Sequence, residues 1–259
     1  MTSYVHGEPT WQDQSSPDAA KAAEFYSALL GWQCPDGDPQ MGGYRNCELA
    51  GKTVAGISPQ MDTDPSPPHW TTYFNVDNAD ETAALVSEHG GQVLFAPMDV
   101  GPMGRMAIFM DPAGAAFGIW QPGLHKGAGA RDQIGAACWH ELLTTDVDAA
   151  KHFYGAVFGW QLETSANADA GGEYTQVGVG DKQVAGIMAK PSMMPAEVPS
   201  HWVVYFAVDD ADAAVAKIRE LGGQVMYGPE TIEPGTFAVA ADTTGATFNV
   251  IKVNPRYMG

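Results

Sequence analysis

The chain contains two copies of one sequence unit of about 120 residues, joined head to tail within 259 residues. Phe25-Tyr26 followed by Gly31-Trp32 recurs as Phe153-Tyr154 followed by Gly159-Trp160. Three further segments recur in the same order: Val54–Ile57 as Val184–Ile187, His69-Trp70 as His201-Trp202, and Gly90–Val93 as Gly222–Val225. Any fold for this chain therefore has to accommodate the same elements twice.

Each copy shows the pattern of a strand, a helix and further strands, and then repeats that pattern once more. In the second copy, Thr145 or Asp146 caps a helix with one apolar stripe, which Gly159 ends. A second helix begins near Asp209-Asp210 and stops at Gly222-Gly223. The strands that follow in each copy complete two βαβββ modules, so the whole chain is predicted to hold four.

Paired βαβββ modules, a first helix ending in Phe-Tyr and then Gly-Trp, and a turn at Asp111-Pro112-Ala113-Gly114 together resemble the glyoxalase/bleomycin-resistance/extradiol-dioxygenase (vicinal oxygen chelate) superfamily. The resemblance covers almost the whole chain and is nearest to the tandem-domain glyoxalase-like proteins of actinobacteria. It implies an α+β fold of duplicated glyoxalase-like domains, whose four modules form two curved-sheet cups. The expected domains are 1–121 and 134–259, with a glycine-rich and proline-containing linker at 122–133, packed as an intrachain pseudo-dimer that is compatible with a monomer, while the oligomeric state is left open by the sequence.

Composition limits the partners of the protein. Thirteen Lys and Arg oppose 31 Asp and Glu, and a formal charge of −18 disfavours nucleic acid and anionic membrane surfaces. No apolar run is long enough for a membrane span, and the first ten residues lack the pattern of a secretion signal, so a cytoplasmic location is expected. The three cysteines, Cys34, Cys47 and Cys138, are expected to be reduced thiols without a disulfide framework.

The resemblance also implies four metal-binding positions per copy, held by His, Gln and Glu side chains in the family's enzymes. Alignment on the shared motifs puts other residues at these positions: Trp11, Gly56, Thr71 and Gly118 in the first copy, and Trp139, Gly186, Val203 and Asn249 in the second. A catalytic metal requires at least three good donors around an open position. We therefore expect no metal and no cofactor.

Strand alternation predicts which side chains face each cup. The predicted ligand-binding residues are Trp11, Asp13, His69, Tyr73, Arg105, Trp139, Glu141, His201 and Tyr205, among which Glu141, His69, Asp13 and His201 are candidate catalytic groups. If modules pair across the two domains, Asp13 shares a cup with His201, and Glu141 with His69. Gln12 and His140 are expected to point away from the cups, while Trp70, Phe74, Trp202 and Phe206 face the helices as core.

Structural alternatives stand beside each of these roles. His69 and His201 follow proline-rich crossovers, where a hydrogen bond to loop backbone accounts for them equally well. Arg105 suits a solvated strand end as well as an anionic ligand. Tyr44 and Tyr174 are expected to be core aromatics with a polar tip.

Three functions are compatible with this pattern. The first is a binder of a small aromatic or hydrophobic molecule, of the sequestration or resistance type, that works without the family metal. The second is an enzyme of the same superfamily, whether a glyoxalase-like lyase or isomerase, a hydroxylase or a dioxygenase, which uses non-family metal ligands or a His and carboxylate pair. The third is an interaction scaffold with filled cups and a large apolar surface patch.

Overall fold

The computed structural model describes residues 4–61, 64–167 and 172–257. Its described α-helices are α1 (Ala19–Leu30), α2 (Ala79–Glu88), α3 (Val147–Phe158) and α4 (Ala211–Glu220), with short 3-10 turns η1 (Pro39–Met41) and η2 (Pro255–Tyr257). Each α-helix begins after a side-chain cap, from Asp18, Asn78, Asp146 and Asp210, whose oxygen accepts backbone N–H groups of the first turn. Gly31 and Gly159 end α1 and α3 in the left-handed conformation, as their sequence positions predicted.

The strands form two sheets. The first repeat contributes β1 (Pro9–Ser16), β2 (Arg45–Leu49), β3 (Lys52–Pro59), β4 (His69–Asn75), β5 (Gln92–Asp99), β6 (Gly104–Met110) and β7 (Ala116–Pro122). The second contributes β8 (Ala137–Thr144), β9 (Gln161–Asn167), β10 (Gly172–Val179), β11 (Lys182–Ala189), β12 (His201–Ala207), β13 (Gln224–Ile232), β14 (Gly235–Ala241) and β15 (Thr247–Val253). The strand orders are β2-β3-β1-β4-β7-β6-β5 and β13-β14-β15-β12-β8-β11-β10-β9.

These elements confirm the predicted α+β fold of duplicated βαβββ modules, with one local difference. In the first module the strand that should follow α1 is reduced to isolated bridges, Gln33 with Glu48 and Asp38 with Tyr44. Pro35, Gly37 and Pro39 occupy that segment, and proline has no N–H to donate to a strand ladder. The matching segment of the second repeat lacks proline and forms β9.

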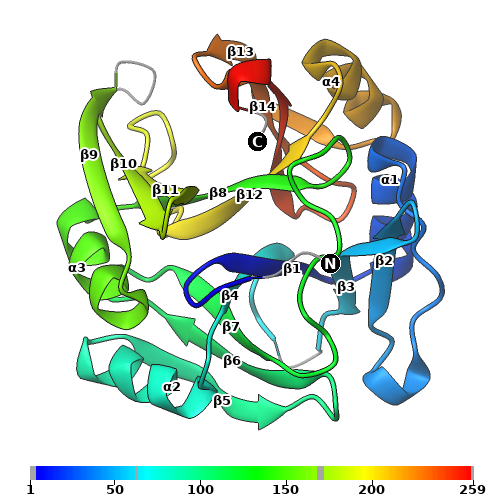
Figure 1. Cartoon of the computed structure of the whole chain (residues 1–259). Helices are drawn as coiled ribbons and strands as arrows, with labels where there is room; N and C mark the ends of the chain where they lie inside the picture. The colour runs from blue at the N-terminus through cyan, green and yellow to red at the C-terminus, as the bar shows by residue number, and fades with distance from the viewer. Residues whose placement is uncertain (1–3, 62–63, 168–171, 258–259) are drawn as a thin grey trace. The chain divides into compact units, whose positions relative to one another are not determined.

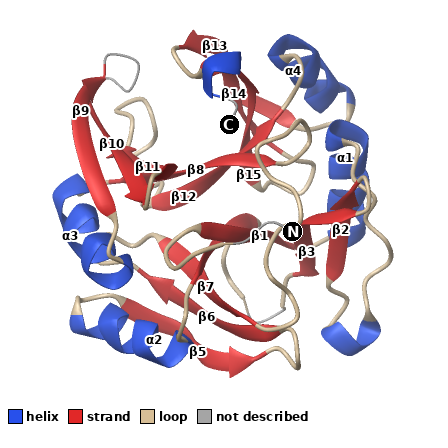
Figure 2. Cartoon of the chain, viewed as in Figure 1, coloured by secondary structure: helices blue, strands red, loops and turns tan. Residues whose placement is uncertain are grey.

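The chain divides into two compact units, each made from parts of both repeats. Unit 1 comprises 1–11, 72–127 and 140–202, and unit 2 comprises 12–71, 128–139 and 203–259. Helices α2 and α3 lie together in unit 1, and α1 and α4 in unit 2 (Figure 1). In each unit the helices cover the strands from one side (Figure 2), and the residues between them form one continuous hydrophobic core.

Strand alternation assigns the two sides of the strands in each unit. Trp70 and Phe206 belong to the core of unit 2, and Phe74 and Trp202 to the core of unit 1, as predicted. Their neighbours along β4 and β12, among them Tyr73 and Tyr205, belong to neither core. We call the side of the strands opposite the helices the open side, since a ligand in a cup would lie there.

A buried tyrosine links the repeated motifs in each core. In unit 2, Trp70 Nε1 donates to Tyr26 Oη at 2.9 Å, and Tyr26 Oη donates to Asp242 at 3.0 Å. In unit 1, Trp202, Tyr154 and Asp111 make the same chain, with lengths of 2.9 and 3.1 Å. The Phe-Tyr motif of one repeat therefore binds the Asp turn of the other, and burial raises the pKa of both tyrosines well above the ordinary value.

The expectation that all three cysteines are reduced is wrong for two of them. Cys34 and Cys47 form a disulfide in unit 2, while Cys138 is free, and burial raises the pKa of its thiol to about 12. The antiparallel bridge between Gln33 and Glu48 sets Cys34 opposite Cys47. This bridge joins two segments on either side of a loop, and no sequence pattern indicated it.

No helix in the described part of the chain is long and apolar enough to cross a membrane.

Candidate functional site

Two four-stranded sheet faces occupy matching places on the open sides of the two units. The β4–β7 face of unit 1 consists of Tyr73, Asn75, Phe95, Met98, Met106, Ile108, Gly118 and Trp120. The β12–β15 face of unit 2 consists of Tyr205, Ala207, Tyr227, Glu230, Phe237, Val239, Asn249 and Ile251. The strand register makes Tyr73 the counterpart of Tyr205, and Gly118 the counterpart of Asn249.

The β12–β15 face is aromatic. Tyr227, Val239, Asn249 and Tyr205 follow one another across the four strands in register, and Phe237 lies in the next row. The Phe237 ring centroid is 6.3 Å from that of Tyr205 and 5.9 Å from that of Tyr227, within the usual range for interacting rings. Tyr227 Oη donates to Glu230 at the outer edge of the face.

Asn249 places a polar group in the middle of this face. The residue is 4% exposed, and its Oδ1 has no hydrogen-bond partner among the described residues. Phe248 and Val250, its neighbours in β15, belong to the helix-side core, so the Asn249 side chain faces the open side. The large majority of buried side-chain polar atoms are hydrogen-bonded, so this amide oxygen is an exception that calls for a reason.

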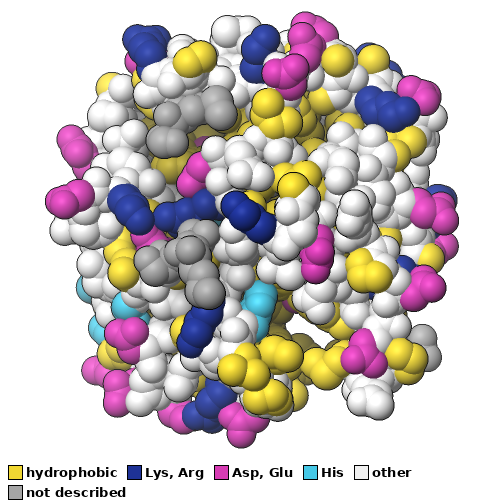
Figure 3. Space-filling view, turned by 45° about the vertical axis from the view of Figure 1, so that its right-hand side comes forward, with side chains coloured by type: hydrophobic (Ala, Val, Ile, Leu, Met, Phe, Trp, Pro, Cys, Tyr) yellow, Lys and Arg dark blue, Asp and Glu magenta, His cyan; other side chains and the backbone are white. Residues whose placement is uncertain are grey.

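The β4–β7 face differs in chemistry. Its outer strand β5 exposes Phe95 and Met98 at 49% and 51%, and Met106 and Ile108 beside them are half-buried. Hydrophobic side chains gather at the bottom of the face shown in Figure 3, at the height of β5 in Figure 1. On this face the side-chain oxygen that is buried without a partner in the described part of the chain is Asn75 Oδ1, one row away from the position that Asn249 occupies in unit 2.

Tyr73 fills the space above Gly118. A Cβ atom at Gly118 would lie 2.3 Å from Tyr73 Cδ1, so no larger residue fits there without moving the ring. Gly118 is one of the positions predicted above for the family's metal-binding side chains. The tyrosine ring thus occupies the space that any side chain at position 118 would need.

A second glycine, Gly56 in unit 2, is filled in the same way. A Cβ at Gly56 would lie 1.8 Å from Tyr44 Oη and 2.9 Å from Asp13 Cβ. Tyr44 Oη donates to Asp13 Oδ2 at 3.2 Å, and Asp13 pairs in register with Gly56. Tyr44 is therefore part of the predicted site and not only a core aromatic.

Unit 1 repeats this arrangement with a longer carboxylate. Glu141 is 7% exposed and pairs in register with Gly186, and Tyr174 Oη donates to Glu141 Oε1 at 2.9 Å. Tyr174 thus joins Glu141 as Tyr44 joins Asp13. The sequence indicated both tyrosines through their recurrence, but their partners depend on strand pairing.

The two candidate histidines make the expected hydrogen bonds to loop backbone. His69 Nδ1 donates to Pro67 O and His201 Nδ1 to Pro199 O, both at 2.8 Å. Because a carbonyl oxygen only accepts, Nδ1 carries a proton in both rings, and in the tautomer this requires of a neutral ring Nε2 is an acceptor. Burial is the main cause that lowers the pKa of His201, and the nearby Lys190 lowers it further.

The two tryptophans at the first family ligand position lie outside both helix-side cores. Trp11 is buried, and the His125 ring packs edge-on against it at 4.5 Å. The Trp120 ring lies 5.4 Å from the same histidine, whose pKa burial lowers. Trp139, the counterpart of Trp11, is half-buried. His125 comes from the predicted linker, and the sequence did not indicate it because nothing in its spacing relates it to Trp11.

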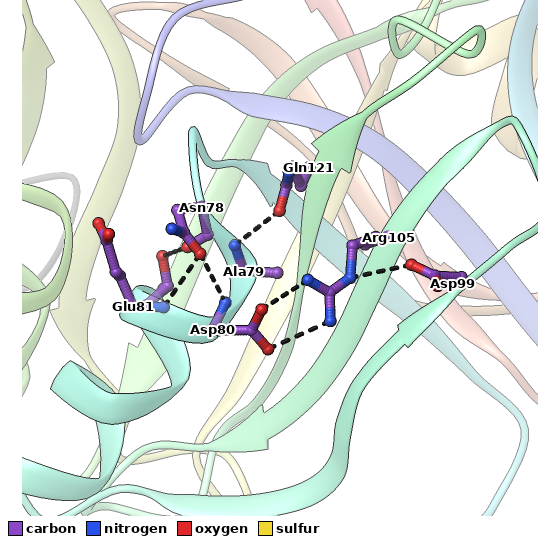
Figure 4. Close-up of polar contacts among 8 residues, drawn as sticks. Asn78, Ala79, Asp80, Glu81, Asp99, Arg105 and Gln121 are labelled. Carbon is purple, nitrogen blue, oxygen red and sulfur yellow. Dashed lines mark hydrogen bonds and ion pairs between the residues drawn. The ribbon is translucent and has the colours of Figure 1, made fainter.

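Arg105 is occupied by two carboxylates (Figure 4). Its guanidinium donates to both carboxylate oxygens of Asp80, at 2.5 and 3.1 Å, and its Nε lies 3.0 Å from Asp99. Asp80 belongs to the first turn of α2, whose cap Asn78 lies beside it. This network ties β6 to α2 and leaves Arg105 little capacity for an anionic ligand.

One conditional prediction is wrong. The strand order puts β1 and β4 in one sheet and β8 and β12 in the other. Asp13 therefore belongs to the same sheet as His69, and Glu141 to the same sheet as His201. Modules of one repeat share a sheet, whereas modules of different repeats share a helical core.

The residues at the predicted metal positions do not fit a divalent ion. An indole, a hydroxyl and two glycines stand there in the first repeat, and an indole, a valine, a glycine and an amide in the second. Among the residues with described structure, no group of three or more His, Cys, Asp and Glu is arranged to hold a metal. Tyr44 and Tyr73 also fill the space at two of the positions.

Comparison with known proteins agrees with this fold. The family model for the Glyoxalase/Bleomycin resistance protein/Dioxygenase superfamily matches residues 13–119 and 134–250. The putative glyoxylase CFP32 of Mycobacterium tuberculosis is 43% identical over 258 residues, covering 98% of this chain and 97% of its own. The anthracycline biosynthesis protein DnrV of Streptomyces peucetius is 39% identical over 274 residues, covering 99% and 97%.

Solved structures share the fold at low identity. The Mn(II)-bound glyoxalase from Novosphingobium aromaticivorans superposes with a TM-score of 0.64 at 16% identity, covering 98% of this chain and 89% of its own. The 2,3-dioxygenase LapB from Pseudomonas sp. KL28 superposes with a TM-score of 0.65 at 15% identity, covering 97% and 96%.

Proposed function

Because the chain belongs to the glyoxalase/bleomycin resistance/dioxygenase superfamily, we propose that it binds a small hydrophobic or aromatic molecule without the family's metal ion. The observation that carries this proposal is that two tyrosine side chains occupy space that side chains at predicted metal positions would need. Tyr44 Oη lies where a side chain at Gly56 would begin, and the Tyr73 ring lies where one at Gly118 would begin. At two of the predicted donor positions the space is therefore taken by aromatic groups that suit an organic ligand.

Each predicted residue has a distinct role in this proposal. Trp11, Trp139, Tyr73 and Tyr205 supply apolar contact on the open sides of the units. The Tyr44–Asp13 and Tyr174–Glu141 pairs supply polar groups whose orientation is set by their mutual hydrogen bonds. His69 and His201 offer Nε2 as an acceptor. We leave Arg105 out, because Asp80 and Asp99 hold its guanidinium.

The name of the relative DnrV suggests which molecules to try first. An anthracycline carries a planar polycyclic aromatic system, and aromatic side chains suit such a ligand. We therefore expect saturable quenching of tryptophan fluorescence by an anthracycline aglycone, with the same Kd in a chelator and in added manganese. Trp139→Ala is expected to weaken binding with little loss of stability, since Trp139 lies outside the cores. Binding that appears only with added metal contradicts the proposal.

The second candidate is a lyase or isomerase of the glyoxalase type, which the name of the relative CFP32 favours. It is tested by assaying isomerisation of the methylglyoxal–glutathione hemithioacetal with nickel, zinc, manganese and iron. Glu141→Ala and His69→Ala serve as variants. Metal-stimulated turnover that both substitutions abolish establishes this enzyme function in place of metal-free binding.

A further inference from the structure

We infer that the β12–β15 face of unit 2 takes a planar aromatic ligand that donates a hydrogen bond to Asn249 Oδ1. The inference rests on the proposed function and adds the place of binding and the chemical class of the ligand. Three features of the face support it. The side-chain oxygen of Asn249 has no partner among the described residues, aromatic rings lie next to it, and the exposure of the side chains increases toward β13.

The acceptor is the first observation. Asn249 is 4% exposed and its Oδ1 has no partner among the described residues. Leaving a buried amide oxygen unsatisfied costs free energy, and leucine has nearly the same shape without that cost. A ligand O–H or N–H directed at Oδ1 recovers this free energy in the complex, which explains why an amide is useful at this position.

The rings are the second observation. Tyr205 stands beside Asn249 in register, and Tyr227 lies two strands away in the same row. Phe237 is tilted by 50° to Tyr205 and by 40° to Tyr227, so the three rings form a connected strip next to the amide. Aromatic side chains provide large contact area for flat rings at little cost in side-chain entropy.

The gradient of exposure is the third observation. Tyr205 and Asn249 are buried at 8% and 4%, Val239 and Phe237 are half-buried, and Glu230 on β13 is exposed. The face is therefore accessible from β13 and closed around the amide. A flat ligand approaching over β13 meets Tyr227 and Phe237 first and reaches Asn249 with its donor end.

The matching face of unit 1 lacks this combination. Glycine stands at position 118 where unit 2 has Asn249, and Tyr73 fills the space above it. Met106 and Phe95 take the places of Phe237 and Tyr227. Asn75 supplies an unpartnered oxygen in another row, so Asn75→Leu is a matched control that changes the same group in the other unit.

The experiment compares 2-hydroxyanthraquinone with 2-methoxyanthraquinone, which differ in one hydrogen-bond donor. Binding to the whole protein is followed by tryptophan fluorescence for wild type, Asn249→Leu and Asn75→Leu. Wild type is expected to bind the hydroxy compound about tenfold more tightly, the effect of one hydrogen bond of about 1.4 kcal/mol. Asn249→Leu is expected to lose this preference and to bind the methoxy compound as tightly as wild type does. Asn75→Leu is expected to keep the wild-type preference for the hydroxy compound.

Stability separates a ligand contact from a structural role. Since Asn249→Leu removes an unsatisfied buried amide, its Tm is expected to be equal to or above that of wild type. If Asn249→Leu has a lower Tm than wild type and still prefers the hydroxy compound over the methoxy compound, the inference is overturned. It is also overturned if Asn75→Leu loses this preference. Wild type that binds neither anthraquinone also overturns it, while the chelator experiment on the anthracycline aglycone decides the proposed function independently.

Discussion

One backbone plan is shared by the β4–β7 face of unit 1 and the β12–β15 face of unit 2. Among the side chains that a ligand on these faces would touch, only one tyrosine is the same in both. Unit 1 presents methionine, isoleucine and an exposed phenylalanine beside Gly118. Unit 2 presents a strip of rings beside Asn249. Their helix-side cores, in contrast, retain the same Trp–Tyr–Asp chain. Duplication thus preserved the residues that assemble the fold and left the open faces free to differ.

The largest expected difference in stability between the two units comes from the disulfide, because among the described residues it occurs in unit 2 alone. Cys34 and Cys47 are separated by 13 residues, and opening such a loop typically costs about 3 kcal/mol. Reduction, or the Cys34→Ser/Cys47→Ser variant, is expected to lower hydrogen-exchange protection in α1 and α4 more than in α2 and α3. Equal loss of protection in all four helices contradicts this assignment to one unit.

Adding a side chain at Gly118 tests whether the Tyr73 ring blocks that position. Gly118→Ala is expected to lower the free energy of unfolding by about 2.5 kcal/mol, since the new Cβ lies 2.3 Å from Tyr73 Cδ1. In the Gly118→Ala/Tyr73→Ala double variant the two effects should be less than additive in a urea-unfolding cycle. Additive effects would show that the ring and position 118 are independent.

The buried tyrosines are expected to differ between units despite their matching bonds. Gln14 also donates to Asp242 in unit 2, whereas Leu142 stands at the corresponding place in unit 1. Tyr154→Phe therefore removes the one partner that Asp111 Oδ2 has among the described residues and should cost about 2 kcal/mol, against about 1 kcal/mol for Tyr26→Phe. Urea unfolding of both variants measures this, and a larger cost for Tyr26→Phe reverses the order.

The smallest expected difference concerns pH. Burial lowers the pKa of His125 and His201, both in unit 1. A folded pKa below the unfolded value of about 6.5 means that the unfolded chain binds more protons, so stability is lost as pH falls below about 6.5. Wild type should lose more Tm between pH 7.5 and 5.5 than His125→Gln/His201→Gln. The same loss in both proteins excludes these histidines as the cause.

Much of the fold was predictable because it depends on short-range patterns. Asp146 and Gly159 mark the ends of α3 by capping, and alternation along β4 and β12 correctly separated Trp70 and Phe206 from Tyr73 and Tyr205. The site was harder to predict, because its contacts join residues that are distant in sequence. Tyr44 approaches Asp13 only through the pairing of β2 and β3 with β1, and Cys34 meets Cys47 only through a bridge across a loop.

The sequence by itself determined the repeated modules and the side of each strand that is buried against helices. These follow from periodicity and residue identity, which act within about ten residues of chain. The tertiary structure decided that one repeat supplies each sheet while both repeats supply each core. It also decided that tyrosines fill the space beside Gly56 and Gly118, and that the buried Asn249 Oδ1 has no hydrogen-bond partner among the described residues. Strand pairing and packing between distant segments produce these features, and no local pattern encodes them.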